Sequence, residues 1–167
     1  MPATILVSVE EYLTTSYRPD CDYLEGELLE RNVGEAEHSR LQTKIAAWLF
    51  NREKELRITV YTEQRVQVKA RRFRIPDVTV VAGDGPATGI IKSPPFLCIE
   101  ILSPEDRLTQ MRERVGDYLD FGVSYVWVID PRIRLATVYT ADNVREVKDG
   151  ILSTENPDIT VNLHELA

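Results

Sequence analysis

Two short apolar stretches, Arg74-Ile-Pro-Asp-Val-Thr-Val-Val81 and Pro95-Phe-Leu-Cys-Ile-Glu-Ile-Leu-Ser-Pro104, decide the fold of this chain. Each is rich in β-branched and aliphatic residues and is bounded by Pro or Gly, which is typical of a buried strand. Each also carries one carboxylate, Asp77 near the start of the first and Glu100 near the end of the second. A buried strand does not tolerate an unpaired carboxylate. The two acids therefore predict a shared cation, provided that the strands are neighbours.

Composition limits the class of protein. The chain has 167 residues, 43% of them hydrophobic and 28% charged, so we expect one globular domain over residues 1–167. No apolar run approaches the roughly 20 residues that span a bilayer, and the N-terminus has no basic, cleavable leader. Cys21 and Cys98 lie in or beside apolar runs, which favours reduced thiols. These features predict a cytoplasmic protein with no membrane partner.

The charge of the chain bears on nucleic-acid binding. A net charge of −7 argues against a general nucleic-acid binder, because such proteins are usually basic. A nucleic-acid function would then need bound metal or a local basic patch. Lys69, Arg71, Arg72 and Arg74 supply four cations within six residues. They could hold a DNA backbone by counterion release, or they could be the charged tip of a hairpin.

The order of predicted elements indicates an α/β protein. Helices are predicted after the N-cap candidate Ser8, over 36–56, and over 107–121 with Gly122 as the C-terminal glycine. Alternating or continuously apolar runs predict the strands. Two hairpins are expected, over 22–31 and 135–147. Further strands are expected over 58–69 with a bend near Glu63, over 75–81, 96–102 and 123–129, and within 159–166. We therefore expect a mixed central β-sheet flanked by helices on both faces.

The pair of acids predicts a particular kind of metal site. If their strands are adjacent, Asp77 and Glu100 present only oxygen ligands, which fits Mg²⁺ or Mn²⁺ better than zinc. Such an ion can acidify a bound water and neutralise charge on a phosphate, as phosphodiester hydrolysis requires. The alternative is structural: the two acids cap loops or pair with Arg74 and Arg107.

Several motifs, taken in order, resemble those of one known family. Ile75-Pro-Asp77 followed by Glu100-Ile-Leu-Ser-Pro104 resembles the signature of the Uma-type restriction endonucleases, within the PD-(D/E)XK nuclease superfamily. Asp22-Tyr-Leu-Glu-Gly-Glu-Leu28 is similar to that family's N-terminal strand motif, and His38 stands where the family often opens its first long helix. Gly122–Pro131 resembles the segment that follows the family's second helix. The resemblance runs from about residue 8 to 140 and implies a restriction-endonuclease-like core.

The resemblance also implies roles for individual residues. Asp77 and Glu100 would bind the metal, and Asp22 would be an auxiliary acid. The superfamily places a lysine two residues after the second acid, but Leu102 stands there in this chain. The Uma-type pattern often offers a lysine from the following helix, and here Arg114 takes that place. Arginine can stabilise a phosphate, yet it stays protonated and transfers protons poorly.

Three functions remain open at this point. The first is a Mg²⁺-dependent endodeoxyribonuclease, a homodimer in the cytoplasm, in which His38 contacts a phosphate or a metal-bound water; His38 could equally be a buried histidine paired with a carboxylate. The second is a catalytically silent nuclease fold that binds nucleic acid or a protein, which Leu102, Arg114 and the acidic composition favour. The third is a metal-dependent enzyme for a small phosphorylated substrate, although the chain has no phosphate-binding loop.

Overall fold

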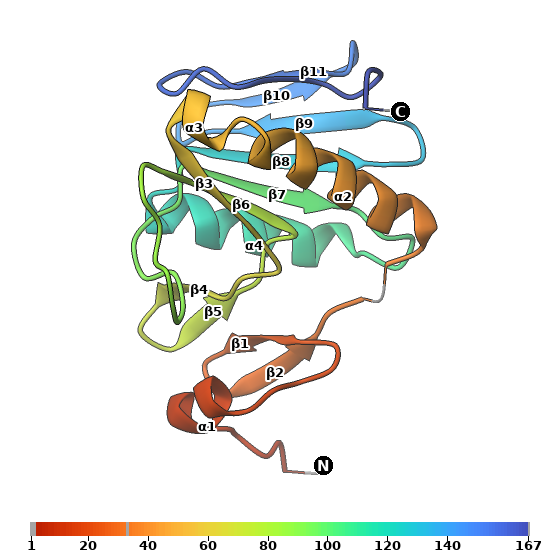
Figure 1. Cartoon of the computed structure of the whole chain (residues 1–167). Coiled ribbons are helices and arrows are strands. Elements are labelled where there is room, and N and C mark those ends of the chain that lie inside the picture. The colour runs from red at the N-terminus through yellow and green to blue at the C-terminus, as the bar shows by residue number, and fades with distance from the viewer. Residues whose placement is uncertain (1–2, 33, 167) are drawn as a thin grey trace.

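A six-stranded mixed sheet forms the centre of the protein (Figure 1). The computed structural model describes residues 3–32 and 34–166. The strand order is β10-β9-β8-β7-β6-β3, in which β7 and β8 are parallel and every other pair is antiparallel. The strands are β3 (Ile58–Thr62), β6 (Val78–Ala82), β7 (Leu97–Ile101), β8 (Tyr125–Asp130), β9 (Leu135–Tyr139) and β10 (Val144–Val147). The predicted mixed sheet is confirmed, with the two acid-bearing stretches in adjacent strands.

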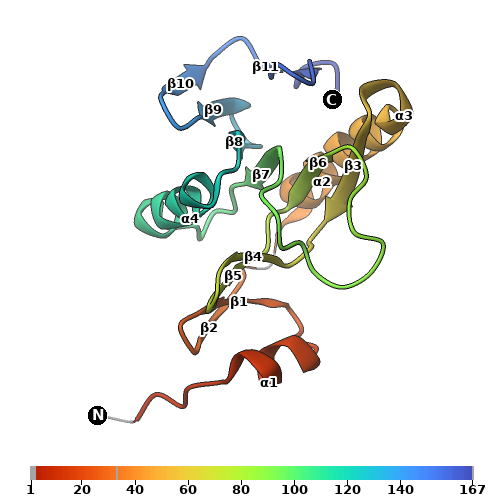
Figure 2. The same ribbon diagram turned by 90° about the vertical axis from the view of Figure 1, so that its left-hand side faces the viewer.

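Helices cover both faces of this sheet, as Figure 2 shows with α2 (Ala36–Phe50) and α4 (Leu108–Phe121) on opposite sides of β7. Alternation along β7 divides its side chains between two cores. Leu97, Ile99 and Ile101 pack in the cluster that contains the apolar residues of α2, and Cys98 packs in the cluster that contains those of α4. Glu100 shares the face of Cys98, so its carboxylate projects toward α4.

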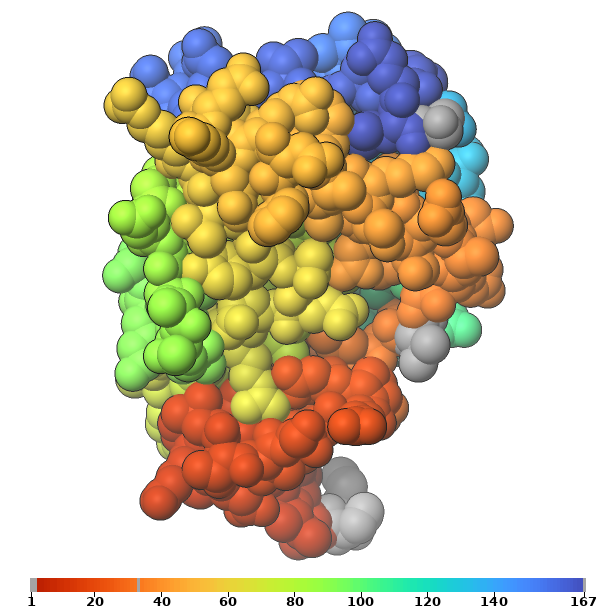
Figure 3. Space-filling view, viewed as in Figure 1, coloured from red at the N-terminus to blue at the C-terminus, as the bar shows by residue number. Residues whose placement is uncertain are grey.

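A second sheet carries the N-terminal part of the site. Its order is β2-β1-β5-β4, and it lies with α1 at the lower end of the molecule in Figures 1 and 3. Ser8 caps α1 by accepting a hydrogen bond of 3.1 Å from the backbone of Glu11, and the predicted hairpin turns at Glu25-Gly26. The elements are α1 (Val9–Thr14), β1 (Cys21–Leu24), β2 (Glu27–Glu30), β4 (Val66–Lys69) and β5 (Arg72–Arg74).

The predicted helix over 36–56 is wrong in one respect, because it is two helices. After α2 the chain turns at Asn51-Arg52, and α3 (Glu53–Leu56) follows. Arg52 leaves helical geometry and places its guanidinium over the Trp48 ring, 4.0 Å from the centroid. The Glu53 carboxylate accepts a hydrogen bond from the Val60 backbone of β3. These two contacts accompany the end of α2, and the apolar periodicity gave no sign of them.

The bend predicted near Glu63 is a change of sheet. Glu63 has a φ of 49°, and the chain leaves β3 of the central sheet there to enter β4 of the second sheet. The C-terminal segment adds a small sheet of β11 (Ile151–Ser153) and β12 (Thr160–Asn162), of which the sequence predicted the second strand alone. Within the described residues, the helices are all too short or too polar to cross a membrane.

Candidate active site

The two acids meet at one end of the adjacent strands β6 and β7 in the central sheet. In the antiparallel pairing of β6 with β7, Val78 lies opposite Ile99, so one residue further Asp77 lies opposite Glu100. Both side chains are almost fully buried. One atom, Nη2 of Arg31, lies 2.8 Å from Oδ1 of Asp77 and 3.7 Å from Oε2 of Glu100. The two carboxylates therefore share one cationic partner.

Asp77 is held as an anion by donors on both oxygens. The Ile101 backbone N–H donates to Oδ2 at 2.7 Å, and His38 Nε2 lies 3.3 Å from the same oxygen. Burial raises the pKa of Asp77, but His38, Arg31 and the Ile101 N–H outweigh burial and hold that pKa below its usual value. The hydrogen bond to Asp77 raises the pKa of His38 in return. Of the two roles open to His38, the structure shows the buried histidine paired with a carboxylate.

Glu100 is the less stable of the two anions. Burial raises its pKa to about 7, and the neighbouring Asp77 carboxylate adds to the effect. Arg114 and Arg31 oppose the shift, with Arg114 Nη1 3.4 Å from Oε2. The Tyr118 hydroxyl donates to Oε1 at 2.5 Å. Glu100 therefore depends on the nearby arginines to remain charged.

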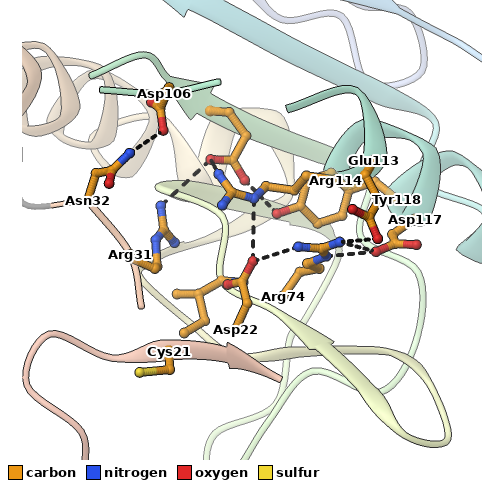
Figure 4. Close-up of polar contacts among 12 residues, drawn as sticks. Cys21, Asp22, Arg31, Asn32, Arg74, Asp106, Glu113, Arg114, Asp117 and Tyr118 are labelled. Atoms are coloured by element: carbon orange, nitrogen blue, oxygen red, sulfur yellow. Dashed lines mark hydrogen bonds and ion pairs between the residues drawn. The ribbon is translucent and has the colours of Figure 1, made fainter. Parts of the chain in front are cut away.

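Asp22 extends the cluster inward from β1 (Figure 4). Its Oδ2 lies 3.4 Å from Arg114 Nε and 3.0 Å from Arg74 Nη1, and its Oδ1 accepts from the Ile75 backbone. Both oxygens are already in use and the side chain is fully buried. Asp22 consequently orients the two arginines.

The structure corrects the predicted DNA-binding set. Arg74 is 1% exposed and binds Asp117 at 2.7 Å, while Arg72 is half-buried and lies 2.9 Å from the same carboxylate. Both guanidinium groups neutralise buried acids and are not available to a DNA backbone. Lys69 and Arg71 are exposed at the turn between β4 and β5, so the prediction now depends on these two residues.

A hollow of about 290 Å³ opens beside Asp77, and its wall includes Arg31, His38, Ser39 and Gln42. A second void of only about 10 Å³, roughly the space of one water molecule, lies beside Glu100 and Arg114. Arg31 and His38 line both spaces. The cluster is therefore reachable through the larger hollow on the Asp77 side, and the space on the Glu100 side is much smaller.

The residues present fit a magnesium ion in a sparse way. Among residues 3–32 and 34–166, no three His, Cys, Asp or Glu side chains are arranged to hold a metal ion. Magnesium, however, commonly binds through one or two carboxylates and retains several waters. Asp77 and Glu100 match this ligand set in number and chemistry. Leu102 adds no polar group, because it packs against the apolar cluster beneath α4.

All five predicted site residues, Asp22, His38, Asp77, Glu100 and Arg114, lie in one connected cluster. Sequence analysis missed Arg31, Asp117 and Tyr118. Arg31 follows β2 and reaches the acids only because the hairpin docks beside them, which no local pattern reveals. Tyr118 packs in the apolar cluster beneath α4, and its hydroxyl donates a hydrogen bond to Glu100.

Comparisons with known proteins agree with this geometry. The model of the Uma2 family, described as "Putative restriction endonuclease", matches residues 9–163. No curated protein matches significantly. Among solved structures, a putative nuclease belonging to DUF820 from Anabaena variabilis ATCC 29413 is similar, with a TM-score of 0.81 and 20% identity over 96% of this chain and 97% of that one. The structural likeness shows the shared fold, and the family match over nearly the whole length shows that this chain belongs to the Uma2 family of putative restriction endonucleases.

Proposed function

We propose that the protein is a magnesium-dependent endonuclease that hydrolyses phosphodiester bonds of DNA. The observation that carries the proposal is the convergence of Asp77 and Glu100 on one atom, at the wall of an accessible hollow. Membership of a family described as "Putative restriction endonuclease" supports DNA as the substrate. The exposed Lys69 and Arg71 offer further contacts to its backbone.

Each side chain has a role that its contacts support. Asp77 and Glu100 would hold the ion, which when bound acidifies water and neutralises charge on the phosphate. Arg114 would bind a phosphate oxygen, because its guanidinium is fixed between Asp22 and Glu100. It cannot accept a proton at any ordinary pH. His38 would position Asp77 through their 3.3 Å contact.

The test is cleavage of duplex DNA with Mg²⁺ or Mn²⁺ by Asp77→Asn and Glu100→Gln. Each substitution is nearly isosteric and removes the charge needed for the ion, so we expect cleavage to be abolished while the thermal melting profile stays cooperative. Arg40→Ala, on an exposed part of α2, is the control and should cleave normally. Cleavage that survives either acid substitution would refute the proposal.

A silent nuclease fold is the second candidate. Two observations favour it: Arg31 lies between the carboxylates, and Arg114 stands where the resemblance leads one to expect lysine. Wild-type protein that binds DNA but never cuts it with either metal would establish this alternative.

We also propose that the protein acts as a homodimer, because a duplex has two strands to cut. Light scattering measures the mass of the complex that the protein forms with a short duplex. A mass corresponding to one chain per duplex at saturation would contradict it.

A further inference from the structure

Among the described residues, Arg31 is the one cation that contacts both acids. Its Nη2 lies 2.8 Å from Asp77 and 3.7 Å from Glu100, so this nitrogen lies between the two carboxylates. Any divalent ion that uses both carboxylates needs oxygen atoms that Arg31 now contacts. Like charges at such separations repel strongly wherever water is largely excluded. Arg31 and the ion therefore compete for the same two acids.

Arg31 contributes to the charge balance of the cluster. Four buried acids are matched by four guanidinium groups along a continuous set of contacts, formed by Asp22, Asp77, Glu100 and Asp117 with Arg31, Arg72, Arg74 and Arg114. Removing a cation from this balance would leave a buried carboxylate unpaired, which is costly. A divalent cation bound to Asp77 and Glu100 would supply two positive charges. The charge of Arg31 would then no longer be needed to neutralise these two carboxylates.

Arg31 has both the freedom and the donors to move. Its long contact of 3.7 Å to Glu100 is weaker than its contact to Asp77, and its Nη1 is buried with no hydrogen-bond acceptor in the part of the chain that the structure describes. The side chain also borders the hollow of about 290 Å³, so an outward rotation places the guanidinium where a substrate enters. A guanidinium group binds phosphate through two parallel hydrogen bonds.

We infer that Arg31 is an exchangeable phosphate-binding residue. In the absence of metal it neutralises Asp77 and Glu100, and when a divalent cation binds it leaves the carboxylates and binds the phosphate of the substrate. This inference rests on the proposed function, since it takes the same two acids as the metal ligands. It goes further by assigning one side chain to both states of the site.

The test measures Mn²⁺ binding and DNA cleavage on the same variants. Free Mn²⁺ is followed by its paramagnetic resonance signal during titration of the protein. We expect Arg31→Ala to bind Mn²⁺ about tenfold more tightly, because the competing charge is gone, and to cleave DNA more slowly, because a phosphate ligand is gone. A purely structural arginine would weaken both. Arg40→Ala removes the same charge from an exposed site on α2 and should change neither.

Arg31→Gln is the second variant, to be used if Arg31→Ala folds poorly. It keeps a hydrogen-bond donor for Asp77 but removes the charge, so we expect the same tighter Mn²⁺ binding and slower cleavage. Unchanged or weaker Mn²⁺ binding by a folded Arg31 variant would overturn the inference and leave the proposed function intact. Wild-type protein that binds no Mn²⁺ at millimolar concentration would overturn both.

Discussion

Two arginines at opposite ends of one ionic cluster behave differently in this fold. Arg74, at the inner end, is 1% exposed and contacts Asp22 at 3.0 Å and Asp117 at 2.7 Å. Arg31, at the outer end, has a side chain that is 14% exposed, with one short contact to Asp77 and one long contact to Glu100. The inner end is fixed, and the outer end can be rearranged.

This difference between Arg74 and Arg31 suggests that the inner part of the network serves stability and the outer part serves function. A buried ion pair adds little over a well-packed apolar pair, yet removing one partner is strongly destabilising because the other charge remains buried. Arg74 fits that description, since it joins α4 to the second sheet through Asp117 and Asp22. Arg31 borders a hollow, so water can reach the charges that its removal would expose.

The largest expected effect is the loss of stability in Arg74→Ala. Two buried carboxylates lose a partner, which should lower the free energy of unfolding by about 3–5 kcal/mol and the melting temperature by roughly 6–20 °C. Arg31→Ala should lower both by clearly less. Calorimetry of the two variants measures the comparison. Equal losses would show that the two ends of the cluster are equally structural.

The next effect concerns Arg114, which links the two ends through Asp22 and Glu100. Arg114→Ala should reduce cleavage by about a hundredfold, the usual result of removing a group that stabilises charge in the transition state. Arg114→Lys should keep or raise activity, because an ammonium is a compact charge that transfers protons more readily. Initial cleavage rates at saturating Mg²⁺ decide this. Full activity of Arg114→Ala would assign the residue to structure alone.

Sequence patterns predicted the fold well where a single element carries the signal. The strands of Asp77 and Glu100 are identified by local apolar runs, and Gly122 ends its helix with a φ of 110°, as a C-terminal glycine should. The patterns failed where a contact from another element decides the outcome. The chain leaves α2 at Asn51, although no Gly or Pro stands nearby, and the Glu53 carboxylate accepts a hydrogen bond from the Val60 backbone of β3.

The same distinction applies to the site. The acids and Arg114 could be predicted because their residue types and order resemble a known signature. Arg31 could not, since it reaches Asp77 across 46 residues of sequence through the docking of a hairpin. The assignment of Arg74 to DNA binding failed for the same reason. A run of cations looks exposed in sequence, and the partner that buries this one, Asp117, lies on a distant helix.

A smaller effect is expected at Leu102, where the resemblance described in the sequence analysis leads one to expect a lysine. Its side chain packs with the apolar cluster beneath α4, on the face shared with Glu100. Leu102→Lys should therefore lower the melting temperature because apolar packing is disrupted, and it should give no gain in cleavage. Leu102→Met is the control, since it preserves volume and should change little. A rise in cleavage by the lysine variant would show that this face opens to the substrate.

The smallest effect is expected at the exposed turn between β4 and β5. Replacing Lys69 and Arg71 by Gln should weaken DNA binding uniformly across sequences and reduce the slope of its salt dependence by about 0.9 for each phosphate that is no longer neutralised. Fluorescence anisotropy in an Asp77→Asn background at several salt concentrations measures the slope without cleavage. The matched control replaces Lys54 and Arg57, two exposed cations at α3, and removes the same charge elsewhere. An identical slope in the Lys69/Arg71 variant and its control would show that this turn is only a solvated hairpin tip and does not touch DNA.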